Sequence, residues 1–200
     1  MLDRFYQIVD GSHWLESFLP LGLKLVQLRI KDLPEADVRS EISTSVHLCK
    51  EAGATLVVND FWEQAIDLGA DYVHLGQEDL ADADLAALRR AGIKLGISTH
   101  SDEELDIALS ATPDYVALGP IYPTILKKMT WAPQGLEKIG IWKQRVSCPL
   151  IAIGGITLER APGVFAAGAD SICVVTDVLR HAAPGQRLSD WLDQRSVWKN

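Results

Sequence analysis

The sequence has little cysteine, no excess of positive charge and no apolar run of membrane-spanning length. Its three cysteines, Cys49, Cys148 and Cys173, are far apart and form no C-x-x-C motif, which indicates reduced thiols rather than disulfides. The first residues lack the basic and apolar regions of a signal peptide. We therefore expect a cytoplasmic protein with no membrane association.

The net charge argues against nucleic acid or anionic lipid as a partner. The 19 Lys and Arg residues and 27 Asp and Glu residues give a formal net charge of -8, which is unsuited to a broad surface for nucleic acid or anionic lipid. A small cluster of cations could still bind a phosphorylated ligand. With 200 residues, 48% of them hydrophobic, the chain can bury one sizeable core. We expect a single domain over residues 1–200.

Short apolar segments alternate with helical patterns eight times along the chain. These segments are near-continuous, which is typical of parallel strands covered on both faces. They are residues 5–9, 25–29, 54–58, 71–75, 93–97, 115–118, 149–153 and 171–175. Repeated right-handed crossovers between such strands predict an α/β fold, a single (β/α)8 TIM barrel of minimal size. An open doubly wound sheet is the alternative, but no G-x-G-x-x-G motif follows the first strand.

The helical patterns lie between these segments, and several of them are followed directly by glycine. Ser101 and Glu104 form a capping-box pattern at the start of one helix. The other expected helices cover residues 12–19, 34–52, 61–68, 80–91, 135–145, 158–167 and 187–195.

Polar residues gather where the expected strands end. In a TIM barrel the active site lies at the carboxyl ends of the strands. The opposite strand ends show no comparable set, and this asymmetry indicates an enzyme. The residues are Arg29, Lys31, Asn59, Asp60, Gln77, Asp79, Ser98, His100, Thr124, Lys127, Gly154, Gly155 and Thr176.

The acidic residues of this set have two interpretations. Asp60 and Asp79 could each cap a helix. Their joint appearance beside Asn59 and Gln77 instead favours an oxygen-rich Mg²⁺ site that substrate phosphates complete. His74 is expected in a packed layer of the barrel and not as a ligand.

The glycines and cations suggest a phosphorylated ligand. Gly154-Gly155 could be a simple turn, or with Thr176 it could present backbone N–H groups to a phosphate. Arg29 and Lys31 could be a solvated pair, or both could reach one dianionic group.

Six short blocks of residues form a pattern that spans most of the chain. They are Gln27-Leu28-Arg29-Ile30-Lys31, Asn59-Asp60, His74-Leu75-Gly76-Gln77-Glu78-Asp79, Gly96-Ile97-Ser98-Thr99-His100, Gly119-Pro120-Ile121-Tyr122-Pro123-Thr124 and Ala152-Ile153-Gly154-Gly155-Ile156. Each block alone is a weak signal. Together, and in this order, they resemble the thiamine phosphate synthase family.

The resemblance implies a transferase with one Mg²⁺ ion held by Asp60 and Asp79. It would join 4-amino-5-hydroxymethyl-2-methylpyrimidine diphosphate to a thiazole phosphate, carboxylated or not, giving thiamine phosphate and pyrophosphate. Residues implied for the pyrimidine diphosphate are Gln27, Leu28, Arg29, Ile30, Lys31, Asn59, Ser98 and Lys127, with Arg29, Lys31, Ser98 and Lys127 as the catalytic group. Residues implied for the thiazole phosphate are Thr124, Ile125, Leu126, Gly155, Val175 and Thr176.

The implied chemistry needs no protein nucleophile. Diphosphate leaves a benzyl-like CH2 group once Mg²⁺ and the cations Arg29, Lys31 and Lys127 neutralise its charge. The aminopyrimidine ring can share positive charge, so a carbocation-like path is expected before the thiazole nitrogen attacks. The partners are then small phosphorylated molecules, and a two-fold homo-oligomer is possible on general grounds.

Two rival functions differ from this one. A thiazole tautomerase shares the barrel but needs no diphosphate–metal site, whereas the pairs Asn59-Asp60 and Gln77-Asp79 are intact here. A phosphate-binding barrel without catalysis is suggested by Leu126, since the family usually has Pro-Thr-x-Thr-Lys in this loop. Ile30, where many members carry an acid, leaves the diphosphate site less negative.

Replacing Leu126 with threonine should lower the KM for the thiazole phosphate. The added hydroxyl would donate a hydrogen bond to a charged group, worth roughly 1.5–3 kcal/mol. Steady-state kinetics measures the change, with Leu126→Val as the control because valine matches threonine in shape but has no hydroxyl. An unchanged KM in the threonine variant would argue against this contact.

Overall fold

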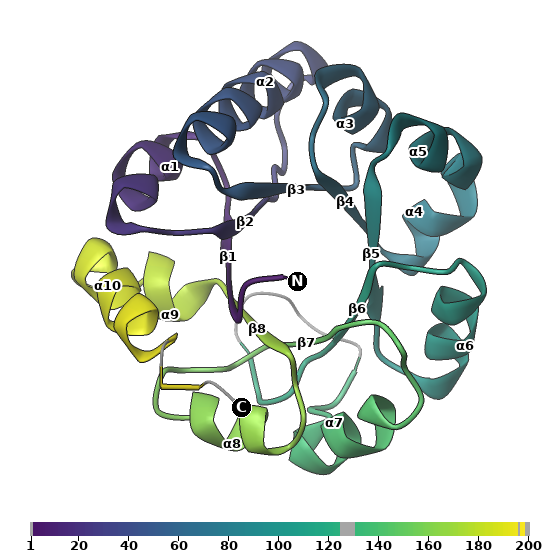
Figure 1. Ribbon diagram of the computed structural model, residues 1–200, viewed down its shortest axis with the longest axis vertical. Helices are drawn as coiled ribbons and strands as arrows, with labels where there is room; N and C mark the ends of the chain where they lie inside the picture. The colour runs from purple at the N-terminus through teal and green to yellow at the C-terminus, as the bar shows by residue number, and fades with distance from the viewer. Residues whose placement is uncertain (1, 125–130, 196, 199–200) are drawn as a thin grey trace.

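The eight strands form one closed parallel barrel. In the computed structural model, which describes residues 2–124, 131–195 and 197–198, β1 to β8 pair in sequence order and β8 pairs with β1. Helices surround this barrel on the outside (Figure 1). The predicted (β/α)8 fold is therefore confirmed.

The elements alternate along the chain as expected. The strands are β1 (Phe5–Val9), β2 (Leu25–Leu28), β3 (Thr55–Asn59), β4 (Tyr72–Leu75), β5 (Lys94–Thr99), β6 (Tyr115–Leu118), β7 (Leu150–Ile153) and β8 (Ser171–Val174). The helices are α1 (His13–Phe18), the 3-10 turn η1 (Leu19–Leu21), α2 (Glu35–Ala52), α3 (Trp62–Leu68), α4 (Gln77–Asp82), α5 (Leu85–Ala91), α6 (Asp102–Ser110), α7 (Gly135–Lys143), α8 (Ala161–Ala166), α9 (Thr176–Leu179) and α10 (Pro184–Arg195). In the described ranges, no helix combines the length and the apolar character needed to cross a bilayer.

Alternate residues of each strand face the barrel interior or the surrounding helices. The outward residues, such as Leu28 and Val58, join helix side chains in one large buried cluster. The inward residues, such as Tyr6 and Tyr115, form a second cluster that packs the interior. Leu2, from the segment that lies near the barrel centre in Figure 1, packs against this inner cluster. The barrel is thus a filled core, as its inward side chains dictate.

An aspartate precedes three of the strands and holds the neighbouring strand in register. Asp71, Asp114 and Asp170 stand immediately before β4, β6 and β8. Each carboxylate accepts a hydrogen bond from a backbone N–H near the start of the preceding strand, which would otherwise lack a partner at the end of the sheet. The donors are Leu56 at 2.9 Å, Leu95 at 2.9 Å and Leu150 at 2.7 Å.

The helix expected at residues 80–91 is wrong as a single element. The chain breaks between α4 and α5, where Ala83 is extended with ψ 137°. Asp84 then caps α5, its Oδ1 accepting a hydrogen bond from the Ala87 N–H at 2.8 Å. A side-chain cap competes with helix continuation, and here the cap prevails.

Other helix boundaries also differ from the expectation. α8 begins at Ala161 rather than near residue 158, and the short α9 after β8 was not expected. α10 begins at Pro184 rather than at Arg187. Proline is tolerated in the first turn because its missing N–H has no intrahelical partner there, so Pro162 and Pro184 mark true helix starts.

Replacing Asp114 with alanine should lower the free energy of unfolding by about 1–3 kcal/mol, because the Leu95 N–H loses its acceptor. Urea denaturation followed by circular dichroism measures the change. Asp82→Ala, which removes an exposed carboxylate on α4, is the control and should stay within about 0.5 kcal/mol of the original protein. Equal small losses in both variants would contradict the role given to Asp114.

Candidate active site

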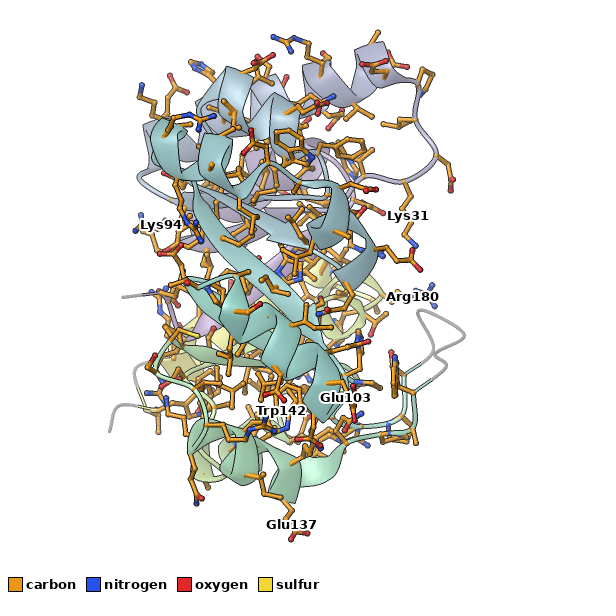
Figure 2. All side chains as sticks on the ribbon, turned by 90° about the vertical axis from the view of Figure 1, so that its right-hand side faces the viewer. Lys31, Lys94, Glu103, Glu137, Trp142 and Arg180 are labelled. Carbon is orange, nitrogen blue, oxygen red and sulfur yellow. The ribbon has the colours of Figure 1, made fainter. Side chains whose placement is uncertain are left out.

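The predicted site residues gather at one end of the barrel. In the side view of Figure 2, Lys31 lies at this end with Arg180, and Lys94, the first residue of β5, lies at the opposite end. All strands run in the same direction, so their carboxyl ends meet there. We call this end the mouth; it is formed by Arg29, Asn59, Ser98, Gly155 and Thr176.

Two carboxyl groups, those of Asp60 and Asp79, lie close together at the mouth. Burial, and then the charge of Asp79, raise the pKa of Asp60 to about 6, while the positive charge of Arg29 acts in the opposite direction. The pair can therefore either share a proton or take up a cation.

The backbone at Asp60 has an unusual conformation. Its φ of 68° lies in the left-handed region, which is uncommon for residues other than glycine. Two hydrogen bonds hold it there: the Asp60 N–H donates to the His74 carbonyl at 2.9 Å, and the Asp60 carbonyl accepts from the Trp62 N–H at 2.6 Å. Such a conformation costs on the order of 1–3 kcal/mol, so these bonds help to fix the direction of the carboxyl group.

Asp79 reaches the pair from the first turn of α4. A Cβ added at Gly76 would lie 3.1 Å from the Asp79 Oδ2 atom, so this carboxyl group lies back over the glycine. Phe61 and Gly76 occupy the cap positions of α3 and α4, and neither makes a side-chain cap hydrogen bond. Asp60 and Asp79 therefore do not serve as the helix caps of α3 and α4.

The two amides beside the pair differ in what they contact. Asn59 is buried at the end of β3 and acts to lower the pKa of Asp60. The Gln77 Nε2 donates to the carbonyls of Ser98 at 2.8 Å and Glu104 at 3.5 Å, and so joins α4 to the end of β5. The amide nitrogen of Gln77 is thus committed to the strand, whereas its Oε1 atom is buried and has no hydrogen-bond partner among the described residues. Within the described residues, no three His, Cys, Asp or Glu side chains are arranged to hold a metal ion.

A chain of hydrogen bonds crosses the barrel interior below the mouth. The Ser98 Oγ lies 2.7 Å from the His74 Nε2, and the His74 Nδ1 lies 2.8 Å from the Tyr115 hydroxyl. The Tyr115 hydroxyl is 3.0 Å from that of Tyr6, which accepts from the Gln27 Nε2 at 2.9 Å. His74 is buried as expected, and burial lowers its pKa to about 4. It is more than packing, however, because both ring nitrogens have partners.

The loop after β7 has no room for side chains. Gly154 and Gly155 have φ values of 99° and 64°. A Cβ on Gly154 would lie 2.6 Å from Pro120, and one on Gly155 would lie 2.4 Å from the Pro123 carbonyl oxygen. Arg160 donates a hydrogen bond to the Gly155 carbonyl. Only glycine therefore fits at these two positions, where the chain packs against residues 120–123.

The remaining predicted residues divide between mouth and core. Leu28 and Ile30 are buried in the outer cluster, so only their backbone can face a ligand. Lys31 is exposed, whereas Val175 and Thr176 are half-buried where α9 begins.

The chain is similar to known proteins over most of its length. A family model described as thiamine monophosphate synthase matches residues 6–178. The chain belongs to the thiamine monophosphate synthase family. Membership in this family makes it an enzyme of the transferase class.

Individual relatives of this family member are similar along nearly the whole chain. A thiamine-phosphate synthase from Rhizobium etli is 57% identical over 200 residues, covering 100% of this chain and 98% of the relative. One from Klebsiella pneumoniae is 47% identical over 178 residues, covering 88% and 84%. The solved structure of a thiamine phosphate pyrophosphorylase from Pyrococcus furiosus has a TM-score of 0.87 at 27% identity, covering 98% of this chain and 97% of that one.

Part of the predicted thiamine monophosphate synthase site falls in the loop after β6. Thr124 is the last residue described in the first part of this loop, and it is half-buried. The predictions for Ile125, Leu126 and Lys127 lie outside the described residues.

Asp60→Asn should raise the free energy of unfolding at pH 8. The folded-state pKa of about 6 exceeds the ordinary value of 3.8, so the charged carboxylate destabilises the fold above pH 6, and this penalty is absent below pH 3.8. The gain in the free energy of unfolding should be about 1 kcal/mol at pH 8, since solvent around the pair reduces the effect. It should disappear toward pH 4. Asparagine tolerates the left-handed backbone.

Urea denaturation without metal at both pH values measures this difference. Glu78→Gln, which neutralises the exposed carboxyl group next to Asp79, is the matched control and should change little at either pH. An asparagine variant no more stable than the original protein at pH 8 would show that the carboxyl pair carries no such penalty.

Proposed function

We propose that this chain is a thiamine phosphate synthase. It would join 4-amino-5-hydroxymethyl-2-methylpyrimidine diphosphate to a thiazole phosphate, forming thiamine phosphate and releasing pyrophosphate. The observation that carries the proposal is the proximity of Asp60 and Asp79 at the mouth, across from a glycine loop suited to a phosphate. The 57% identity to the Rhizobium etli thiamine-phosphate synthase supports it.

The pyrimidine diphosphate would bind on the side of β2 to β5. Gln27 and Asn59 would face the ring, and Arg29, Lys31 and Lys127 would neutralise the diphosphate. Arg29 lies close enough to act on the pKa of Asp60, so both side chains can face the same bound diphosphate. Lys31 is exposed at the mouth, so it can reach a ligand without first breaking a buried contact.

The carboxyl pair fits one Mg²⁺ ion. Mg²⁺ prefers oxygen ligands in octahedral geometry and usually keeps water or substrate phosphates among them. Asp60 and Asp79 would supply the protein ligands, and a cation there would offset the unfavourable charge of the pair. When bound, the ion would neutralise charge on the departing diphosphate.

The thiazole phosphate would bind on the side of β6 to β8. The backbone of Gly155 and the start of α9 at Val175 and Thr176 would receive its phosphate, with Thr124, Ile125 and Leu126 from the long loop. Backbone N–H groups at such glycines approach an anion closely because no side chain intervenes.

The reaction itself would be a substitution at the CH2 group of the pyrimidine. The C–O bond to diphosphate breaks with its electron pair leaving on oxygen, and positive charge on CH2 is shared by the aminopyrimidine ring. The thiazole nitrogen then forms the new C–N bond. The described residues would act by holding both reactants in line and by stabilising negative charge, the largest effect in many enzymes.

One assay separates this function from its rivals. Protein, Mg²⁺, the pyrimidine diphosphate and the thiazole phosphate should give equal amounts of thiamine phosphate and pyrophosphate. A carboxylated thiazole should release one CO2 in addition. Isomerised thiazole without pyrophosphate would indicate a tautomerase. Binding of either substrate without turnover would indicate a phosphate-binding barrel.

Asp79→Ala should lower kcat at least about 100-fold, because the metal contributes several kcal/mol of charge stabilisation. Glu78→Ala is the matched control: it removes the adjacent carboxyl group, which is exposed, and should stay within about twofold. Calorimetric titration with Mg²⁺ and pyrophosphate checks the binding separately. Near-normal turnover in the Asp79 variant would overturn the metal assignment.

A further inference from the structure

We infer that the buried chain of Gln27, Tyr6, Tyr115 and His74 fixes the hydroxyl of Ser98 as a hydrogen-bond donor toward the bound pyrimidine diphosphate. The substrate named here rests on the proposed function, whereas the direction of the hydrogen bonds rests on the contacts alone. His74, Tyr115 and Tyr6 are thereby positioning residues.

The chain of contacts is continuous from β2 to β5. The Gln27 Nε2 lies 2.9 Å from the Tyr6 hydroxyl, which lies 3.0 Å from the Tyr115 hydroxyl. His74 continues it, with its Nδ1 2.8 Å from Tyr115 and its Nε2 2.7 Å from the Ser98 Oγ. These four contacts join five side chains in one polar path inside an otherwise apolar core, where each proton needs an acceptor.

The amide of Gln27 gives this path its direction. Because Gln27 donates to the Tyr6 oxygen, the Tyr6 proton is free to point at Tyr115. In the opposite direction, the Tyr6 oxygen would receive two hydrogen bonds and its own buried proton would have no acceptor among the described residues. A buried hydroxyl proton without an acceptor costs free energy, so the first arrangement is favoured.

The remaining protons follow from that choice. The Tyr115 proton points at the His74 Nδ1, so the imidazole carries its hydrogen on Nε2 and donates it to the Ser98 Oγ. The Ser98 oxygen then acts as the acceptor of this bond, and its own proton points elsewhere. Ser98 is half-buried at the end of β5, so the open direction is the mouth.

Ring packing keeps the path in place. The imidazole of His74 stacks on Tyr115 with centroids 5.6 Å apart and planes 19° apart. Tyr6 meets Tyr115 edge to face, with centroids 6.1 Å apart. Rings held on both sides cannot rotate without opening the core, so the four hydroxyl and imidazole groups are preorganised before substrate arrives.

A substrate that binds here must offer an acceptor to Ser98. Diphosphate oxygens and pyrimidine ring nitrogens are acceptors without protons of their own. A serine hydroxyl that was free to rotate could donate or accept, whereas the fixed one only donates toward the mouth. The path therefore favours the pyrimidine diphosphate over ligands that present a donor at this place.

The position of the hydrogen on His74 tests the path without any activity measurement. Protein labelled with 15N-histidine has five such residues, and His74→Asn identifies the signals of His74. We expect the nitrogen shifts of a neutral ring with its hydrogen on Nε2. Hydrogen on Nδ1 would overturn the inference, even if the protein is an active synthase.

Kinetics tests whether the path acts through Ser98. Tyr115→Phe should lower kcat about tenfold, because one hydrogen bond of the path is lost. The KM for the thiazole phosphate should stay within about twofold of the original value. In a Ser98→Ala background the same change should alter kcat less than about twofold, because its target is gone. A full tenfold loss in that background, or no loss in the single variant, would overturn the positioning role.

Tyr72→Phe is the matched control. Tyr72 also packs against the Tyr115 ring, with centroids 6.0 Å apart, but its hydroxyl is outside the path. It should leave kcat and the His74 signals unchanged. If the original protein makes no thiamine phosphate, the proposed function fails, while the labelling experiment still decides the direction of the hydrogen bonds.

Discussion

The site depends on one requirement of a closed barrel: every polar group that points inward must find its partner inside. Eight paired strands leave no edge, and side chains fill the interior. Gln27, His74 and Ser98 point inward near the mouth, and Tyr6 and Tyr115 supply their partners. Because a phenol both donates and accepts, these partners form one continuous path rather than separate pairs. The position of Ser98 is thereby tied to residues on other strands.

The two ends of the barrel use the same residue type in opposite ways. At the amino end, Asp114 and Asp170 accept backbone hydrogen bonds that hold strands in register. At the mouth, Asp60 and Asp79 are set against each other, on a backbone that is itself strained. The first arrangement stabilises the fold, and the second destabilises it when the carboxyl groups are charged. Stability is thus concentrated away from the site, which lets the mouth carry unfavourable charge.

The sequence was sufficient to place the strands and the residues at their ends, because continuous apolar segments and their terminal residues are local features. It was insufficient where side chains compete or reach far. The break at Asp84 depends on a cap competing with helix continuation, and the direction of the Gln77 amide depends on a rotation about its own bonds. The Tyr6–Tyr115 contact joins residues 109 positions apart, so no local pattern records it. Both tyrosines look like ordinary strand residues.

One residue of the sequence pattern gains a physical explanation from the barrel interior. A Cβ at Gly96 would lie 2.0 Å from the Tyr115 ring, so a side chain there would displace that ring. Gly96 and Ser98 are two positions apart on β5 and therefore face the same side of the strand. The glycine makes room for Tyr115, Tyr115 contacts His74, and His74 contacts Ser98. β5 thus supplies both the serine and, at Gly96, the space for the ring that helps to orient its hydroxyl.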